Sequence, residues 1–89
     1  MNWLVYMLRC RDGTIYTGCT NNLTRRLAAH NAGQGAKYTR GRGPVTLIYQ
    51  EPCASRATAL GREAALKKLS RRQKLALCQE LGLINVDDK

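Results

Sequence analysis

Acidic residues are scarce in this chain. Six Asp and Glu stand against fifteen Lys and Arg, so the formal net charge is +9, and only Asp12, Glu51 and Glu63 precede residue 80. The folded surface should therefore carry a positive field, which suits a polyanion far better than a neutral metabolite. A basic structural protein that holds nucleic acid without acting on it is consistent with the same charge.

Histidine and paired cysteines are also scarce. His30 is the one histidine, and no Cys-x-x-Cys pair occurs among Cys10, Cys19, Cys53 and Cys78. This excludes an evident zinc site and is typical of small buried thiols in a reducing compartment. No segment has the layout of a signal peptide, and no apolar run approaches the ~20 residues needed to cross a bilayer. We therefore expect a soluble, cytoplasmic protein with no membrane partner.

Within its 89 residues the chain has room for one domain with a modest core. Trp3 to Cys10 is almost continuously apolar, which indicates a central strand covered on both faces. Thr14 to Cys19 and Val45 to Gln50 have the β-favouring residues of two further strands, the first as a hairpin partner. We expect an α+β fold, a three-stranded antiparallel sheet flanked by three helices, in a single domain over residues 1–82 with a frayed tail at 83–89.

Helix signals mark three segments, residues 23–31, 56–69 and about 71–81. Ser70 and Gln73 form a capping box at the start of the last segment. In the middle segment, Ala57, Leu60 and Ala64 recur at helical spacing, and we expect them to form the stripe that faces the core.

The loop between the first two strands decides how Tyr6 and Tyr16 are placed. A two-residue turn of Asp12 and Gly13 would put the tyrosines on opposite faces of the sheet, because side chains alternate along each strand. A three-residue loop, with Gly13 in the left-handed conformation, would put both on one face, with Gly18 opposite Tyr6. Both registers remain open at this point, and only the second lets the two phenols act together.

The first helix carries its basic residues on two different sides. Leu23 and Leu27 form its apolar stripe, and Arg26 and His30 flank that stripe at about 100° per residue. Arg25 falls on the far side, where we expect it to be solvated. Arg26 and His30 therefore border the core and are candidates for a site.

Two tripeptides, Leu4-Val5-Tyr6 and Tyr16-Thr17-Gly18, have their tyrosines ten residues apart. They resemble the Gly-Ile-Tyr and Tyr-Ile-Gly motifs of the GIY-YIG nuclease superfamily. Arg26 and His30 stand at the spacing of its helical site residues, and Glu63 matches its metal-binding Glu. Over roughly residues 3 to 80 the chain is similar to a small stand-alone member of bacterial type. It departs from the family at Leu4, where members have Gly, and in lacking a clear equivalent of a downstream Asn.

The resemblance implies a metal-dependent DNA endonuclease that hydrolyses a phosphodiester bond, with one Mg²⁺ or Mn²⁺ ion as cofactor and a role such as DNA repair. Tyr6 would be the general base for the attacking water, and Tyr16 its orienting partner. Arg26 would clamp the phosphate, His30 would supply a supporting hydrogen bond, and Glu63 would hold the metal ion. A phenol that takes a proton from water needs its pKa of about 10 lowered toward neutrality, which a nearby cation can do.

Other basic residues are expected to contact DNA phosphates without reading sequence. They are Arg25, Lys37, Arg40, Arg42, Lys67, Lys68, Arg71 and Arg72. Lys74 belongs to the same C-terminal run. Such runs are usually solvated faces, but almost no acidic residues interleave this one.

Each candidate also has a purely structural explanation. The tyrosines can form a cross-strand aromatic contact, Arg26 can be an exposed helix charge, and His30 can be a hydrogen-bonded border residue. Glu63 can pair with Lys67, four residues later on a helix. The alternatives to a nuclease are therefore a nucleic-acid-binding module of the same fold with little or no cleavage, and a basic structural protein. A protein partner or dimerisation is possible but not indicated.

Overall fold

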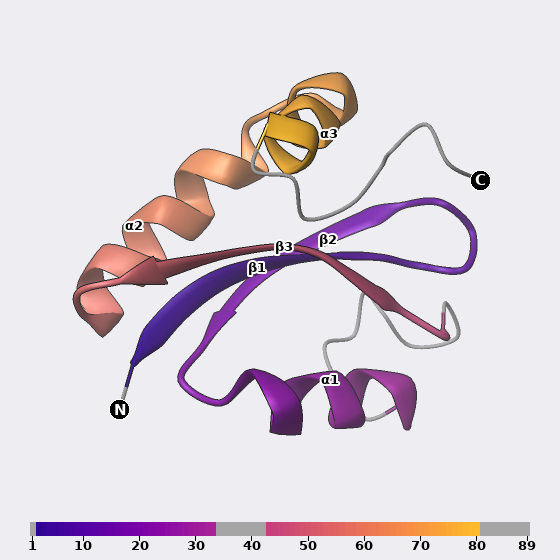
Figure 1. The fold of residues 1–89 in the computed structure, drawn as a ribbon, viewed down its shortest axis with the longest axis horizontal. Helices are drawn as coiled ribbons and strands as arrows, with labels where there is room; N and C mark the ends of the chain where they lie inside the picture. The colour runs from indigo at the N-terminus through magenta and orange to yellow at the C-terminus, as the bar shows by residue number, and fades with distance from the viewer. Residues whose placement is uncertain (1, 34–42, 81–89) are drawn as a thin grey trace.

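The structure is a computed structural model and describes residues 2–33 and 43–80. Strands β1 (Trp3–Arg9), β2 (Ile15–Thr20) and β3 (Thr46–Cys53) form one antiparallel sheet in the order β2-β1-β3. The helices are α1 (Leu23–Asn31), α2 (Arg56–Lys67) and α3 (Arg71–Glu80). Figure 1 shows α1 on one face of the sheet and α2 with α3 on the other. The expected α+β fold class is confirmed.

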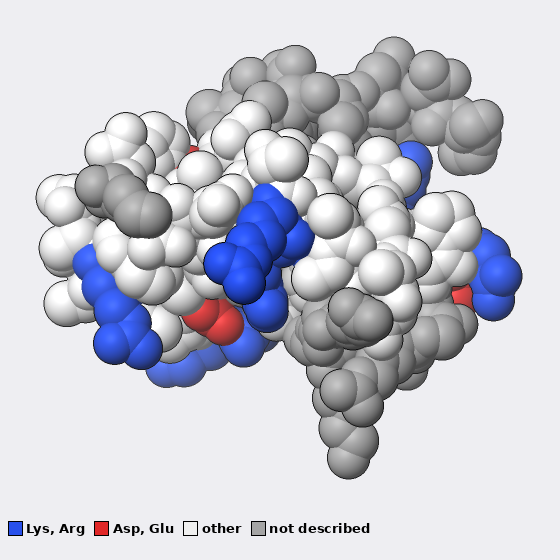
Figure 2. Space-filling view, turned by 90° about the horizontal axis from the view of Figure 1, so that it is seen from below, with Lys and Arg blue, Asp and Glu red and all other residues white. Residues whose placement is uncertain are grey.

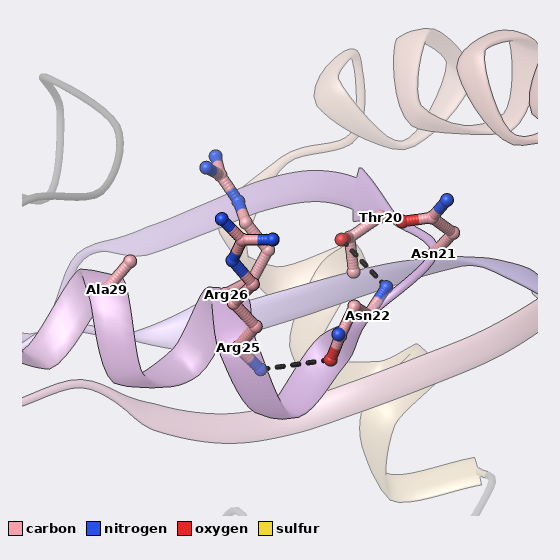
Figure 3. A pocket seen from close by; sticks show the side chains of 6 residues that line it. All are labelled: Thr20, Asn21, Asn22, Arg25, Arg26 and Ala29. Atoms are coloured by element: carbon pink, nitrogen blue, oxygen red, sulfur yellow. Dashed lines mark hydrogen bonds between the residues drawn. The ribbon is translucent and has the colours of Figure 1, made fainter.

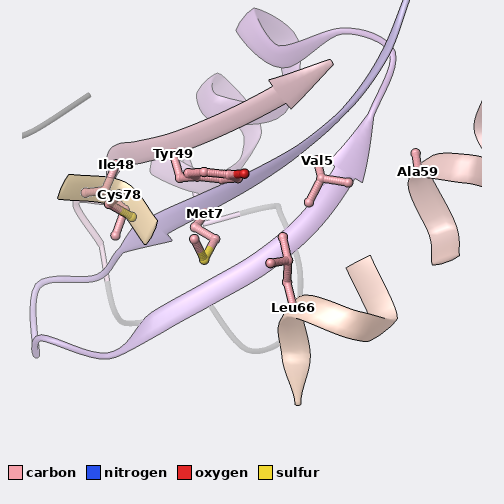
Figure 4. Close-up of a cluster of buried hydrophobic side chains, with 7 residues drawn as sticks. All are labelled: Val5, Met7, Ile48, Tyr49, Ala59, Leu66 and Cys78. Carbon is pink, nitrogen blue, oxygen red and sulfur yellow. The ribbon is translucent and has the colours of Figure 1, made fainter. Parts of the chain in front are cut away.

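Strand β1 is central, as its continuous apolar sequence predicts. All four residues from Val5 to Leu8 are 0% exposed, because helices cover both faces of the sheet. Val5 and Met7 pack in the core beneath α2 and α3, which Figure 4 shows together with Leu66 and Cys78. Tyr6 and Leu8 belong to a second cluster, against Leu23 and Leu27 of α1.

The β1–β2 hairpin has the three-residue loop. Its register pairs Tyr6 with Gly18 and Leu8 with Tyr16, and Gly13 has a φ of +88°. The amide of Cys10 donates to the carbonyl of Thr14, which closes the loop. Both tyrosines therefore lie on the α1 face of the sheet, and the two-residue alternative is excluded.

Strand β3 is longer than the sequence predicts. It continues past Gln50 through Pro52 to Cys53. A proline is tolerated there because β3 is an edge strand, where one missing N–H need not break a ladder. A register shift opposite Met7 and Leu8 marks an irregularity in the β1–β3 pairing.

Helix α2 presents a different face to the sheet from the predicted one. Ala57 and Ala64 are exposed and Leu60 is 47% exposed, whereas Ala59 and Leu66 are buried. The prediction of a core-facing stripe at residues 57, 60 and 64 is wrong. The buried face, with Ala59 and Leu66 seven residues apart, also has helical spacing. It is the face on which Arg62 and Glu63 have partners, Glu51 of β3 and Cys19 of β2.

The helix starts follow the sequence closely. The side chain of Asn22 accepts from the Arg25 amide and caps α1. Ser70 and Gln73 form the predicted reciprocal capping box of α3. The loop cations Lys37, Arg40 and Arg42, the predicted end of the last helix at residues 81–82 and the tail 83–89 lie outside the described residues. None of the described helices is long and apolar enough to cross a bilayer.

Candidate active site

Three rings meet on the α1 face of the sheet. The centroids of Tyr6 and Tyr16 are 6.3 Å apart, and the ring of His30 lies 6.1 Å from Tyr6 and 5.3 Å from Tyr16. Tyr6 and His30 are buried, whereas Tyr16 is half-buried. The cluster therefore has a closed end at Tyr6 and a more accessible side at Tyr16.

Gly18 makes room for this cluster. A Cβ atom at this position would lie 2.7 Å from the Tyr6 hydroxyl oxygen and 3.0 Å from Cε2 of Tyr16. Both distances are too short for ordinary contacts, so any side chain would push the rings apart. The glycine is required here because the Tyr6 phenol lies directly over the β2 backbone.

Arg26 reaches the same rings from α1. It is half-buried, and hydrogen bonding to the Tyr6 side chain, with a smaller contribution from Tyr16, raises the pKa of its guanidinium. Burial raises the pKa of Tyr6 above its ordinary value of 10.0, and the hydrogen bond from Arg26 only partly offsets this. Arg26 thus lowers the pKa of Tyr6, as expected from the sequence, but desolvation of the phenolate raises this pKa by more.

His30 is the partner of the Tyr6 hydroxyl, with Oη 3.1 Å from Nε2. Burial lowers the pKa of His30 below 6.5, and the charge of Arg26 lowers it further. The imidazole is therefore neutral near pH 7, and Nε2 can accept a proton when the Nδ1 tautomer is present.

A polar cavity of about 330 Å³ opens beside Arg26 at the start of α1. Figure 3 shows the side chains of Arg25 and Arg26 extending into it, next to Asn22. Arg25 is exposed, as expected, and it also lines this cavity with Arg26. Two guanidinium groups in one polar cavity can hold phosphate oxygens.

Glu63 lies on the other face of the sheet. Its side chain is 17% exposed, its Oε2 is 2.7 Å from Lys67 Nζ, and it hydrogen-bonds Cys19 of β2. Burial, followed by this contact with Glu63, raises the pKa of the Cys19 thiol to about 11. The structure thus brings together Tyr6, Tyr16, Arg26 and His30 on the α1 face. Glu63 belongs to α2 on the other face, and its partner Lys67 lines a cavity with Tyr16.

Glu63, the metal ligand expected from the sequence, would be the single carboxylate of the site. Among the described residues, no group of three His, Cys, Asp or Glu is arranged to hold a metal ion. A single carboxylate still fits Mg²⁺, which takes oxygen ligands and usually keeps several waters. A metal ion there has to compete with the ammonium of Lys67.

The other basic residues are divided between cavities and open surface. Lys67 and Arg71 line cavities beside β2, and so does Lys74. Lys68 and Arg72 are exposed. Figure 2, which views the molecule from the α1 side, shows several groups of basic side chains and little acidic surface. A polyanion could therefore reach this face without meeting many like charges.

Two residues near this region were not singled out from the sequence. Cys19 contacts Glu63, and Thr17 lines a cavity with Lys67. Both face α2 because they alternate with the residues of β2 that face α1. The β1–β2 register determines which face of the sheet Thr17 and Cys19 are on, but the sequence alone left that register open.

Comparisons with known proteins identify the family. The model of a family described as "GIY-YIG catalytic domain" matches residues 2–76. The chain is 57% identical to UPF0213 protein CPE1444 of Clostridium perfringens over 77 residues, 86% of this chain and 82% of that protein. It is 58% identical to UPF0213 protein VNG_2274C of Halobacterium salinarum over 73 residues, 82% of this chain and 95% of that protein.

Solved structures are similar over nearly the whole chain. The solution structure of protein EF2693 from E. faecalis has a TM-score of 0.64 at 41% identity, covering 96% of this chain and 91% of that one. The solution structure of UPF0213 protein BH0048 from Bacillus halodurans has a TM-score of 0.59 at 46% identity, covering 92% and 87%.

Proposed function

Because the chain belongs to the GIY-YIG catalytic domain family, a family of nucleases, we propose that it hydrolyses a phosphodiester bond in DNA with the help of one divalent metal ion. The observation that supports this most directly is the convergence of Tyr6, Tyr16, Arg26 and His30 on one face of the sheet. A cross-strand aromatic contact alone requires neither a half-buried arginine nor a buried histidine bonded to the phenol.

Arg26 is the phosphate clamp in this proposal. Its guanidinium is half-buried and already hydrogen-bonded to phenol oxygens, so its orientation is restricted before substrate binds. A guanidinium can bind two phosphate oxygens at once and offset the charge that grows in the transition state. Arg25, in the same cavity, holds a neighbouring part of the phosphate backbone.

Tyr6 acts as the general base and passes its own proton to His30. The raised pKa of Tyr6 makes a free phenolate costly near pH 7, whereas the neutral His30 offers Nε2 at 3.1 Å from the hydroxyl. As the phenol oxygen takes a proton from water, its original proton moves to Nε2 and no isolated phenolate forms. Tyr16, on the accessible side of the cluster, orients the attacking water.

Glu63 would hold the metal ion, Mg²⁺ or Mn²⁺, through its carboxylate oxygens. Such an ion offsets negative charge on the phosphate and on the leaving oxygen. The contribution of the chain is a hard oxygen ligand beside the β2 edge, held by contacts with Lys67 and Cys19. A site with one protein ligand is weak until DNA phosphates complete it.

A nucleic-acid-binding module is the second candidate, and the position of Glu63 favours it. The carboxylate is ion-paired with Lys67, and its helix α2 lies on the opposite side of the sheet from α1, which covers the ring cluster. As a binding module, the protein would hold DNA through its basic residues without hydrolysing a phosphodiester bond.

A cleavage assay separates the two functions. Plasmid, branched and single-stranded DNA are incubated with the protein in Mg²⁺, Mn²⁺ or a chelator. We expect metal-dependent nicking that falls by about 100-fold or more in Arg26→Ala and Glu63→Ala, and that is lost in Tyr6→Phe. Arg56→Gln is the control, since Arg56 lies over the Trp3 ring, outside the proposed site. DNA binding by every variant without cleavage by any would overturn the nuclease and support the module.

A further inference from the structure

A second cavity lies on the α2 and α3 side of the β2 edge. Its volume is about 360 Å³, and it is lined by Ile15, Tyr16, Thr17, Lys67 and Lys74. A neighbouring cavity of about 200 Å³ shares Ile15 and Lys74 and adds Thr14 and Arg71. Segments far apart in the sequence thus converge here: β2, the end of α2 and the start of α3.

All the charged residues that line these two cavities are basic. Three cations, Lys67, Arg71 and Lys74, face the two cavities and no acidic side chain does. The guanidinium of Arg71 donates to the carbonyl of Gly13, which directs its charge toward the hairpin. No ion pair of Lys74 occurs within the described part of the chain. The cations are therefore arranged around a concavity, unlike those on the open surface.

Thr17 is the feature that indicates a ligand. Its residue is 2% exposed, and its hydroxyl has no hydrogen-bond partner among the described residues. A buried hydroxyl without a partner costs stability, and valine would fill the same space at no such cost. Thr17 and Lys67 line the same cavity. Rotation of the Thr17 side chain about χ1 can turn its hydroxyl toward an anion held there, which then accepts its hydrogen bond.

Tyr16 connects this cavity to the proposed active site. It lines the cavity, and its side chain also hydrogen-bonds Arg26 on the α1 side. Lys67 provides a second connection, since it binds Glu63 and faces the cavity. A strand that crosses the β2 edge therefore passes both places.

We propose that this cavity binds a backbone phosphate of the nucleic-acid strand, on the same strand as the phosphate held by Arg26, through the Thr17 hydroxyl and the ammonium groups of Lys67 and Lys74. The identification of the strand as DNA rests on the proposed function, whereas the phosphate site itself follows from the cavity. The site makes the strand run across the β2 edge, from the start of α1 toward the start of α3.

The test measures binding without cleavage. Affinity for labelled duplex and single-stranded DNA is measured by fluorescence anisotropy in a chelator, for the wild-type protein, Thr17→Val, Thr17→Ser and Lys74→Gln. We expect Thr17→Val to weaken DNA binding about threefold to tenfold with an unchanged or higher melting temperature, and Thr17→Ser to retain binding. Lys74→Gln should reduce the magnitude of the log–log salt slope by about 1, whereas the charge-matched Arg56→Gln should not.

Other results would overturn the site. If Thr17→Val raises the melting temperature and leaves DNA affinity unchanged, Thr17 is only a packing residue. If Thr17→Val weakens binding of inorganic phosphate, followed by NMR shifts of the backbone amide at position 17, but not binding of DNA, the cavity is a free-anion site. Lys74→Gln still tests the proposal if Thr17→Val does not fold. These tests measure binding and not cleavage. They therefore still test the phosphate site if the protein turns out not to be a nuclease.

Discussion

His30 couples the ring cluster to pH at the scale of a single residue. The folded protein keeps its pKa below 6.5, chiefly through burial, whereas in the unfolded chain the imidazole titrates near that ordinary value. Between the two values the unfolded state holds more protons, so the free energy of unfolding decreases as the pH falls below about 6.5. At higher pH the full contribution is present.

We expect this part of the pH dependence to disappear in His30→Gln, which keeps a polar partner for Tyr6. Denaturant unfolding at about pH 7.5 and about pH 5.5 measures it. If the wild-type protein and the variant lose the same free energy between these two conditions, His30 is not held neutral by the fold.

Lys67 decides how readily Glu63 can take a metal ion. Its ammonium is 2.7 Å from Oε2 of Glu63, in the place where a cation has to bind. We expect Lys67→Met to tighten Mn²⁺ binding to the free protein about twofold to fivefold, because a partly exposed ion pair of modest strength is removed. Electron paramagnetic resonance of free Mn²⁺ gives the dissociation constant.

Lys68→Met is the matched control, since it removes the same charge from the next residue, which is exposed. Glu63→Gln should abolish the binding measured in both. Equal Mn²⁺ affinity in the Lys67 and Lys68 variants would show that only net charge matters and that Lys67 does not compete for the carboxylate.

At the scale of elements, the β1–β2 pair holds the tyrosines together only because Gly18 leaves space. We expect Gly18→Ala to reduce the free energy of unfolding by about 1–3 kcal/mol, because its Cβ would overlap the Tyr6 phenol, and to reduce cleavage as the rings separate. Gly61→Ala is the control: it lies within helix α2 with no atom within 4 Å of the added Cβ, so it should stabilise by about 0.5–1 kcal/mol. Denaturant unfolding of both variants tests this, and equal stabilisation by the two would contradict the tight contact.

The sequence predicts that α2 is a helix but assigns the wrong face of it to the core. Its start is capped by Ser55, whose hydroxyl accepts from the Thr58 amide. Its inner face, however, is set by Ala59 and Leu66 together with the contacts of Arg62 and Glu63. Two apolar faces of one short helix have helical spacing, and only contacts with the sheet decided which of them is buried.

For the whole molecule, the net charge of +9 predicts DNA binding that weakens steeply with salt, because bound counterions are released from the DNA. We expect Arg25→Gln to reduce the magnitude of the log–log slope by about 1 for duplex and single-stranded DNA alike. Arg56→Gln, which also removes one charge, should leave the slope unchanged. Anisotropy titrations across a salt series measure this, and an equal effect of the two changes would mean that only the overall field acts.

The α+β class, the central strand and the three-residue loop option follow from local patterns. The apolar run of β1, the Gly13 turn and the Ser70–Gln73 box are all short-range signals, so they are readable in order along the chain. The spacing of Tyr6, Tyr16, Arg26 and His30 belongs to the same category, since three consecutive elements, β1, β2 and α1, carry these residues.

What the sequence by itself determined is therefore the set of elements and the residues available to a site. Tertiary structure decided which face of α2 is buried, that Glu63 pairs with Lys67 and contacts Cys19 of β2, and that Thr17 is buried without a partner among the described residues. It also made burial the largest influence on the pKa of Tyr6. These properties depend on contacts between elements distant in the chain, and no local pattern of charge or hydrophobicity encodes them.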